Sequence, residues 1–157
     1  MNKLIKFFLT NNKIKEILKN DPLVIVDIGA AFPSKNFYKE FENFVKLISF
    51  DPQIERFSEK ENYYINIALY NKRTKLNFYK TNNHQCSSIL MPNYNFLESF
   101  GKVEEFKIIE TTEIDVDTLD NQLQNINVNN VDFIKLDTQG SELFILEGSS
   151  KYLENVL

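Results

Sequence analysis

The clearest indication of the fold is the stretch Val131-Asp-Phe-Ile-Lys-Leu-Asp-Thr-Gln-Gly-Ser-Glu-Leu143. Residues 131–136 form a short, largely apolar run, which is typical of a strand buried on both faces of a parallel sheet. An acid, an amide and a glycine follow, and apolar residues at helical spacing then begin. In open α/β sheets this rim, at the carboxyl ends of the strands, is where ligands bind. The stretch therefore predicts a strand, a functional turn and a closing helix, with Lys135 near the rim.

Two earlier segments repeat this pattern. Leu23-Val-Ile-Val-Asp-Ile-Gly29 is an apolar strand with an acid close to its end, and Lys46-Leu-Ile-Ser-Phe-Asp51-Pro52 ends in an acid that a proline follows. Proline cannot donate a ladder hydrogen bond, so it stops the strand sharply. Three predicted strands thus end in Asp27, Asp51 and Asp137, and we interpret the three acids as parts of one ligand site.

Composition limits the class of protein. The 157 residues are enough for one domain with its own core, and 43% hydrophobic and 25% charged residues are ordinary for a soluble protein. A net charge of −4 argues against nucleic acid as a partner. The single cysteine, Cys86, cannot form an internal disulfide, which suits the cytoplasm. The apolar runs are shorter than the ~20 residues of a spanning helix, so no stable membrane insertion is expected. A homo-oligomer is compatible with these features.

The N-terminal segment, residues 1–20, is predicted to be amphipathic helix, separate from the domain at 21–157. It carries five lysines among apolar residues, and it lacks the cleavage site of a signal peptide. We expect a helix over 3–19, broken near Asn11-Asn12. Packing on the edge of the sheet is the favoured interpretation, and binding to a membrane surface is the alternative.

The remaining pattern alternates strands and helices, which predicts an α/β sandwich with a mostly parallel sheet. A polar loop at 81–94 interrupts this alternation, and loops of such length are usually functional or disordered. The predicted elements are strands at 23–28, 47–50, 63–69, 75–80, 107–114 and 131–136; a helix opened by Pro33-Ser34 with Phe37, Phe41 and Phe44 on one face; a short helix from Pro52 that buries Ile54 and Phe57; and a helix capped by Asp117 or Thr118 with Leu119, Leu123 and Ile126 inward.

Several of these segments together resemble one enzyme family. Val26-Asp-Ile-Gly-Ala30, Phe50-Asp51-Pro52, the Ser87-Ser88 loop, Asp117-Thr118-Leu119-Asp120 and Ile134-Lys-Leu-Asp-Thr-Gln-Gly-Ser-Glu142 occur in the same order in FkbM-type methyltransferases. The resemblance runs from about Leu23 to Leu153. It implies a Rossmann-like fold, S-adenosyl-L-methionine as cofactor, and a sugar hydroxyl of a glycan or natural product as the methyl acceptor.

The resemblance also assigns candidate residues to the cofactor. Asp51 would accept hydrogen bonds from the ribose hydroxyls, because it lies 24 residues after Asp27, close to the ~20 expected for such an acid. Gly29 would let the backbone approach the cofactor, and Asp27 would face its cationic methionine end. The full set of expected cofactor-binding residues is Asp27, Gly29, Ala30, Asp51, Ala68 and Asp137.

Asp137 and His84 are the candidate catalytic residues, because an acid or a histidine can take the proton of the acceptor hydroxyl. Ser87, Ser88, Gln139 and Glu142 are the candidate substrate-binding residues. Each assignment has a structural alternative: Asp137 as a helix cap, Glu142 as a first-turn acid and His84 as a surface residue. No metal-ligand spacing occurs, although Asp137, Glu142 and His84 could together hold a divalent ion.

Two other classes of function compete with this prediction. A nucleotide-dependent oxidoreductase would need a G-x-G-x-x-G turn, and Gly29-Ala-Ala-Phe-Pro-Ser34 lacks the later glycines. A non-catalytic binding or assembly module is the second alternative. It is suggested by one departure from the family, because no pattern for the family's C-terminal strands follows the closing helix. A second departure, Ala31-Phe32-Pro33 where a second glycine is common, predicts a bulkier and stiffer loop.

Overall fold

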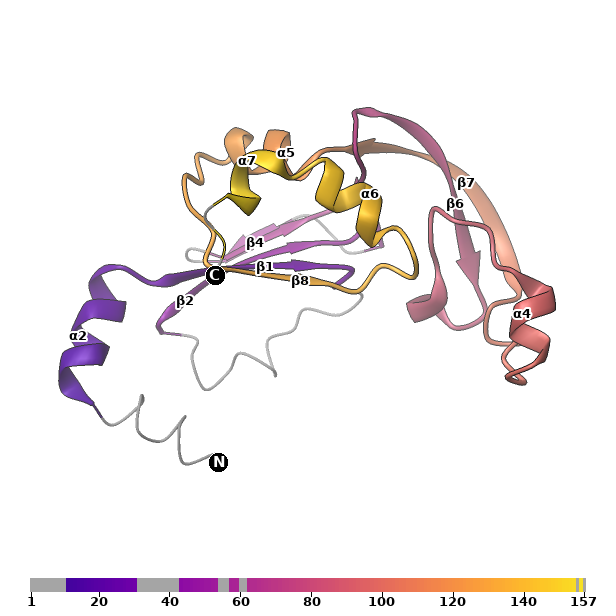
Figure 1. Cartoon of the computed structure of the whole chain (residues 1–157), viewed down its shortest axis with the longest axis horizontal. Helices are drawn as coiled ribbons and strands as arrows, with labels where there is room; N and C mark the ends of the chain where they lie inside the picture. The colour runs from indigo at the N-terminus through magenta and orange to yellow at the C-terminus, as the bar shows by residue number, and fades with distance from the viewer. Residues whose placement is uncertain (1–10, 31–42, 54–56, 60–61, 155, 157) are drawn as a thin grey trace.

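The computed structural model describes residues 11–30, 43–53, 57–59, 62–154 and 156. Within them the chain forms a five-stranded sheet and a three-stranded sheet. Helices lie over one face of the larger sheet, and the smaller sheet extends from it as a long arm (Figure 1). The predicted α/β class with a mostly parallel sheet is confirmed.

The larger sheet has the strand order β3-β4-β2-β1-β8. Its strands are β1 (Leu23–Ile28), β2 (Val45–Phe50), β3 (Phe57–Glu59), β4 (Asn62–Ile65) and β8 (Phe133–Leu136). All neighbours are parallel except β3, which pairs antiparallel with β4. Because β8 pairs with β1 and β1 with β2, the carboxyl ends of these three strands meet at one rim.

The core lies between this sheet and a layer of short helices. Alternate residues of the central strands, such as Val26 and Ile28 in β1, pack with Leu119, Leu123 and Ile145 from the helices. The helices of this layer are α5 (Leu119–Asn125), α6 (Glu142–Glu147) and α7 (Ser150–Leu153), all drawn above the sheet in Figure 1. The layer holds the rim in place from one side.

The smaller sheet has the order β5-β7-β6. It consists of β5 (Ala68–Leu69), β6 (Thr74–Thr81) and β7 (Ile108–Asp117), with β6 and β7 antiparallel over most of their length. The chain between them forms a 3-10 helix, η2 (His84–Cys86), and α4 (Tyr94–Glu98). The remaining described helix, α2 (Asn12–Asn20), lies beyond the opposite end of the larger sheet (Figure 1).

Several predicted elements are confirmed. The strand at 23–28 matches β1, and those at 47–50, 75–80 and 107–114 fall within β2, β6 and β7 or overlap them. Thr118 is the N-cap of α5, where its side chain accepts a hydrogen bond from the Asn121 N–H. The later part of the helix expected over 3–19 is present as α2, which Asn11 caps, whereas the part before residue 11 lies outside the described residues.

Other predictions are wrong in detail. The strand expected over 63–69 is divided between β4 and β5, which belong to different sheets. Phe57, expected in a short helix, begins β3. The closing helix is two helices, α6 and α7, separated at Gly148, where an added Cβ would lie 2.3 Å from the Tyr70 carbonyl oxygen. The helix expected after Pro33, and Ile54, lie outside the described residues; Phe44 occupies the turn before β2.

The strand at 131–136 is not buried on both faces. Its residues in β8 are half-buried at best, and Phe133 is 50% exposed. The reason is its place in the sheet, because among the described strands β8 pairs only with β1 and forms an edge. Asp137 therefore follows an edge strand and not a central one.

Candidate functional site

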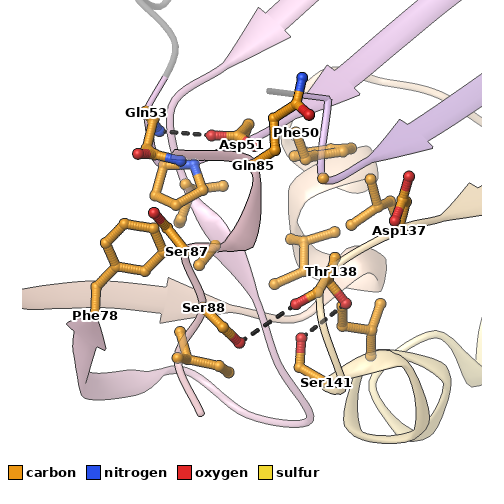
Figure 2. Close-up of a pocket in the computed structure, with 18 of the residues that line it drawn as sticks. Phe50, Asp51, Gln53, Phe78, Gln85, Ser87, Ser88, Asp137, Thr138 and Ser141 are labelled. Carbon is orange, nitrogen blue, oxygen red and sulfur yellow. Dashed lines mark hydrogen bonds between the residues drawn. The ribbon is translucent and has the colours of Figure 1, made fainter. Parts of the chain in front are cut away.

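A pocket lies at the rim where β1, β2 and β8 end. The space between its walls, counted together with the open solvent at its mouth, is about 510 Å³. Its remaining walls come from β5, from Phe78 of β6 and from the loop at 84–89. The pocket is thus enclosed by both sheets, and residues distant in sequence converge on it (Figure 2).

Asp51 is the buried acid of this pocket. It is 5% exposed and follows β2 directly, and its Oδ1 accepts a hydrogen bond of 2.7 Å from the Gln53 N–H (Figure 2). Burial raises the pKa of its carboxyl above the usual range, against the opposing effects of that hydrogen bond and of nearby His84. Such an acid is held where its ionised form is poorly solvated, so a ligand that donates hydrogen bonds to it is favoured.

Asp137 and Gly29 form the second part of the rim. The Asp137 N–H donates to the Ile28 carbonyl oxygen, and Gly29 has φ of +79° directly beside the Asp137 backbone. A side chain at residue 29 would strike that backbone, so glycine is required here by close packing as well as by its torsion angle. The alternative role of Asp137 as a helix cap is wrong, because the N-cap of α6 is Ser141.

A lysine connects two of the predicted acids. Lys135 Nζ lies 3.0 Å from Asp27 Oδ1 and 3.6 Å from Asp137 Oδ2. Asp27 is fully buried, whereas the Asp137 side chain is 61% exposed. Lys135 therefore compensates a buried charge on one side and contacts the rim acid on the other, which agrees with the prediction that Lys135 lies near the rim.

These charges belong to a polar row that crosses four parallel strands. Ser49 and Lys135 flank Asp27 in register, and Tyr64 is the register partner of Ser49. Tyr64, Ser49 and Asp27 are all fully buried. Because side chains alternate along a strand, this row lies on the face opposite the helical layer, one residue before the row of Phe50 and Ile28.

The loop at 84–89 covers the pocket from the arm. Its η2 helix places His84 and Gln85 in the lining, and Gln53 Nε2 donates to the His84 carbonyl oxygen at 3.1 Å. Ser88 is 6% exposed, and its hydroxyl lies 3.3 Å from the carbonyl oxygen of Thr138 (Figure 2). The same hydroxyl lies 3.3 Å from the carbonyl oxygen of Gln139. Ser88 therefore ties this loop to the turn that carries Asp137.

Glu142 folds back on the turn instead of facing the pocket. Its Oε1 accepts hydrogen bonds from the Thr138 N–H, the Thr138 hydroxyl and the Gly140 N–H, at 2.9, 3.2 and 3.3 Å. Partial burial acts to raise the pKa of Glu142, but these donors outweigh it and hold the pKa below the usual range. Gln139, with φ of +59°, and Gly140, with φ of +106°, complete this tight turn.

The sequence as a whole was compared with known proteins. A family model described as the methyltransferase FkbM domain matches residues 27–157, most of the chain. The chain belongs to the FkbM methyltransferase family. No curated protein and no solved structure gave a significant match. The match confirms the predicted family and, with the parallel sheet, the Rossmann-like methyltransferase fold.

The pocket of this FkbM domain contains most of the predicted site residues. Gly29, Asp51, Ala68, His84, Ser87, Ser88 and Asp137 line it. Four others do not: Asp27 and Ala30 are buried beside it, Gln139 is exposed, and Glu142 caps the turn. The hydroxyl of Ser87 accepts a hydrogen bond from the Thr81 N–H, so Ser87 supports the loop as well as lining the pocket.

Several lining residues of the FkbM domain were not predicted. They include Gln53, Phe78, Gln85, Ile89, Thr138 and Ser141. Thr138 and Ser141 lie inside the quoted motif, so their position could have suggested them. The sequence did not identify Phe78 as a pocket residue, because the alternating pattern of β6 does not distinguish a side chain that lines a pocket from one that packs in the core.

The described ranges contain neither a metal cluster nor a membrane-spanning helix. No group of three or more His, Cys, Asp or Glu side chains there could hold a metal ion, so Asp137, Glu142 and His84 do not form the divalent site considered above. In the same ranges, no helix has the length and apolar content needed to span a membrane.

Proposed function

We propose that this methyltransferase uses S-adenosylmethionine to methylate a hydroxyl group of a sugar. Membership in the FkbM family supports methyl transfer as the reaction class. The cofactor is inferred from the pocket, and the sugar acceptor from the sequence resemblance. The observation that carries the cofactor is Asp51, a buried acid at the carboxyl end of β2 inside the pocket.

The residues present fit such a cofactor. Phe50, Ile67, Leu69 and Phe78 provide apolar walls suited to a flat purine ring. Asp51 lines the same pocket at the carboxyl end of β2, where a carboxylate can accept hydrogen bonds from a ribose diol. Gly29 and Asp137 line the pocket where β1 and β8 end. The exposed Asp137 carboxylate would attract the positively charged group of the cofactor.

Bound S-adenosylmethionine supplies an electrophilic methyl group on a sulfonium ion. The chain's own residues then have three tasks: to bind the cofactor, to orient the acceptor, and to receive the acceptor's proton. Asp137 and His84 line the pocket and are the residues proposed to accept a proton at the acceptor oxygen, while Asp51 is assigned to the ribose. Ser88 keeps the His84 loop against the Asp137 turn, so both candidates line the same pocket. Most of the catalytic effect is expected from positioning.

The cytoplasm is the proposed location. Its support is the single, buried Cys86, which forms no disulfide and needs no oxidising compartment.

Calorimetry tests the cofactor. We expect S-adenosylmethionine and its demethylated product to bind the chain, whereas NAD binds much more weakly. Asp51→Ala should weaken binding roughly tenfold to a hundredfold, as expected for the loss of a hydrogen bond to a charged group. Preferential binding of NAD would support an oxidoreductase instead. Undiminished cofactor affinity in a folded Asp51→Ala variant would remove Asp51 from the ribose site.

The acceptor is tested separately by transfer of a labelled methyl group. Candidate acceptors should include a set of monosaccharides and glycans together with small phenols and carboxylic acids. Labelling confined to sugars supports the proposal. Labelling confined to non-sugar acceptors would contradict the sugar acceptor while leaving the cofactor assignment intact.

A further inference from the structure

The helix α2 is amphipathic, yet none of its side chains is completely buried. None of its nine residues is buried, and Ile17 is 55% exposed. The apolar residues Ile14, Ile17 and Leu18 follow a spacing of three and four, so they lie on one face of the helix. Ile14 and Leu18 are half-buried, and α2 lines a hollow together with Asn43 and Phe44 of the turn before β2. The prediction that this segment packs on the edge of the sheet stays a prediction.

The charges on α2 are arranged around that apolar face. With 3.6 residues per turn, Lys13 and Lys15 fall on opposite sides of the apolar stripe, and Lys19 lies on the polar face. Glu16 is the only acid among residues 1–20, which contain five lysines. The chain as a whole carries −4, so positive charge is concentrated at this end of an otherwise acidic protein.

The place of α2 in the fold separates it from the methyltransferase site. The helix ends two residues before β1 begins, at the amino end of that strand, whereas the pocket lies at the carboxyl ends. Figure 1 shows α2 projecting from the sheet on the side away from the arm. The family match also begins at residue 27, after α2. The helix is thus free to serve a purpose that the catalytic domain does not require.

We propose that α2 binds the surface of an anionic membrane. The apolar stripe would enter the boundary between headgroups and acyl chains, and the two flanking lysines would reach the lipid phosphates on either side. Charge complementarity selects this partner, because the positive helix is attached to a negative domain that an anionic surface repels. The helix would lie on the membrane and hold the pocket at the far end of the sheet.

Vesicle co-sedimentation of the full chain tests this inference. We compare vesicles of phosphatidylcholine alone with vesicles of equal parts phosphatidylcholine and phosphatidylglycerol. Binding is expected only to the anionic vesicles. It should weaken strongly as salt rises from about 0.01 M to 1 M, because the Debye length then falls from roughly 30 Å to 3 Å.

Two pairs of matched variants identify the helix. Replacing Lys13, Lys15 and Lys19 with Gln should lower affinity roughly 25-fold, since each of the two flanking lysines contributes about fivefold at an anionic surface. The charge-matched control replaces the exposed Lys72, Lys75 and Lys107 with Gln. Ile17→Gln should also weaken binding, whereas Ile109→Gln, at a residue 64% exposed on β7, should not.

The results separate the possibilities cleanly. Equal losses in the helix variants and in the controls would show non-specific adsorption and overturn the proposal. Equal binding to neutral and anionic vesicles, or no binding at low salt, would also overturn it. Cofactor affinity measured on each variant shows that the domain remains folded, and it is expected to stay unchanged because α2 does not line the pocket.

Discussion

A Cβ atom on Gly29 would lie 1.9 Å from the carbonyl oxygen of Asp137. These two residues directly follow β1 and β8, the strands that carry the two most informative motifs of the chain. Their backbones touch at the rim of the pocket, so the position of Asp137 depends directly on the absence of a side chain at residue 29. This contact links the N-terminal glycine motif to the C-terminal acid motif.

Gly29→Ala is expected to destabilise the protein by roughly 3–5 kcal/mol, because it combines a backbone clash with a positive φ. Gly101→Ala is the matched control. Gly101 has φ of +64° but no atom within 4 Å of an added Cβ, so its cost should be only about 1–2 kcal/mol. Denaturant unfolding measures both changes. Equal costs for the two variants would show that the contact with Asp137 adds nothing.

Asp51→Asn is expected to make the fold more stable, by roughly 0.5–2 kcal/mol, while weakening cofactor binding. Burial raises the pKa of Asp51 above 3.8 in the folded state, so stability falls as pH rises from 3.8 through the raised pKa. The Asn side chain removes this ionisation and can still accept the Gln53 N–H. The melting temperature of the variant should therefore exceed that of wild type near neutral pH, and the difference should disappear in acid. A variant less stable than wild type at neutral pH would contradict this account.

Asp117→Asn is the control for Asp51→Asn, because both acids are 5% exposed. Burial acts to raise the pKa of Asp117, but donors on Asn121, Gln122 and Thr118 outweigh it and lower the pKa. Its contribution to stability is thus present above 3.8 and is lost as pH falls through the lowered pKa. We expect Asp117→Asn to cost about 1–3 kcal/mol at neutral pH without changing cofactor affinity.

Lys135→Met is expected to cost roughly 3 kcal/mol or more, because it removes the cation 3.0 Å from the fully buried Asp27. Combining it with Asp27→Asn should recover much of that loss, since no buried carboxylate then remains to be compensated. A double-mutant cycle on the free energy of unfolding measures the coupling. Additive costs would mean that the two side chains stabilise the fold independently.

Asp137→Asn tests the proposed catalytic role. The side chain is 61% exposed and does not cap α6, so melting temperature should change little. If Asp137 takes the acceptor's proton, the rate of methyl transfer should fall on the order of a hundredfold or more. His84→Gln is measured in parallel, and the larger loss of rate identifies the proton acceptor. Full activity in both variants would leave neither residue with that role.

The local elements were largely predictable from the sequence. β1 has the predicted bounds and Thr118 caps α5, because apolar periodicity and capping chemistry are properties of neighbouring residues. The division of 63–69 was not predictable. Its residues are strand-forming throughout, and only pairing with β2 on one side and β7 on the other shows where the chain passes between sheets.

Part of the candidate site was predictable, because the strand ends that carry its acids can be recognised from the local sequence pattern. Asp51 and Asp137 end strands, and strands that lie side by side bring their ends together. The separation of roles within one motif was not visible in the sequence. Asp137 faces the pocket, whereas Glu142, five residues later, turns back to accept three hydrogen bonds from the turn.

By itself, the sequence determined the α/β class, the strand ends that carry acids and the family, because each depends on residue type and spacing along the chain. Only the tertiary structure decided that β8 lies at the edge of the described sheet, that Lys135 pairs with the buried Asp27, and that Ser88 joins the His84 loop to the Asp137 turn. These features depend on contacts between residues 50 or more positions apart. Local pattern carries no information about such contacts, since the same residues would show the same periodicity in any strand order.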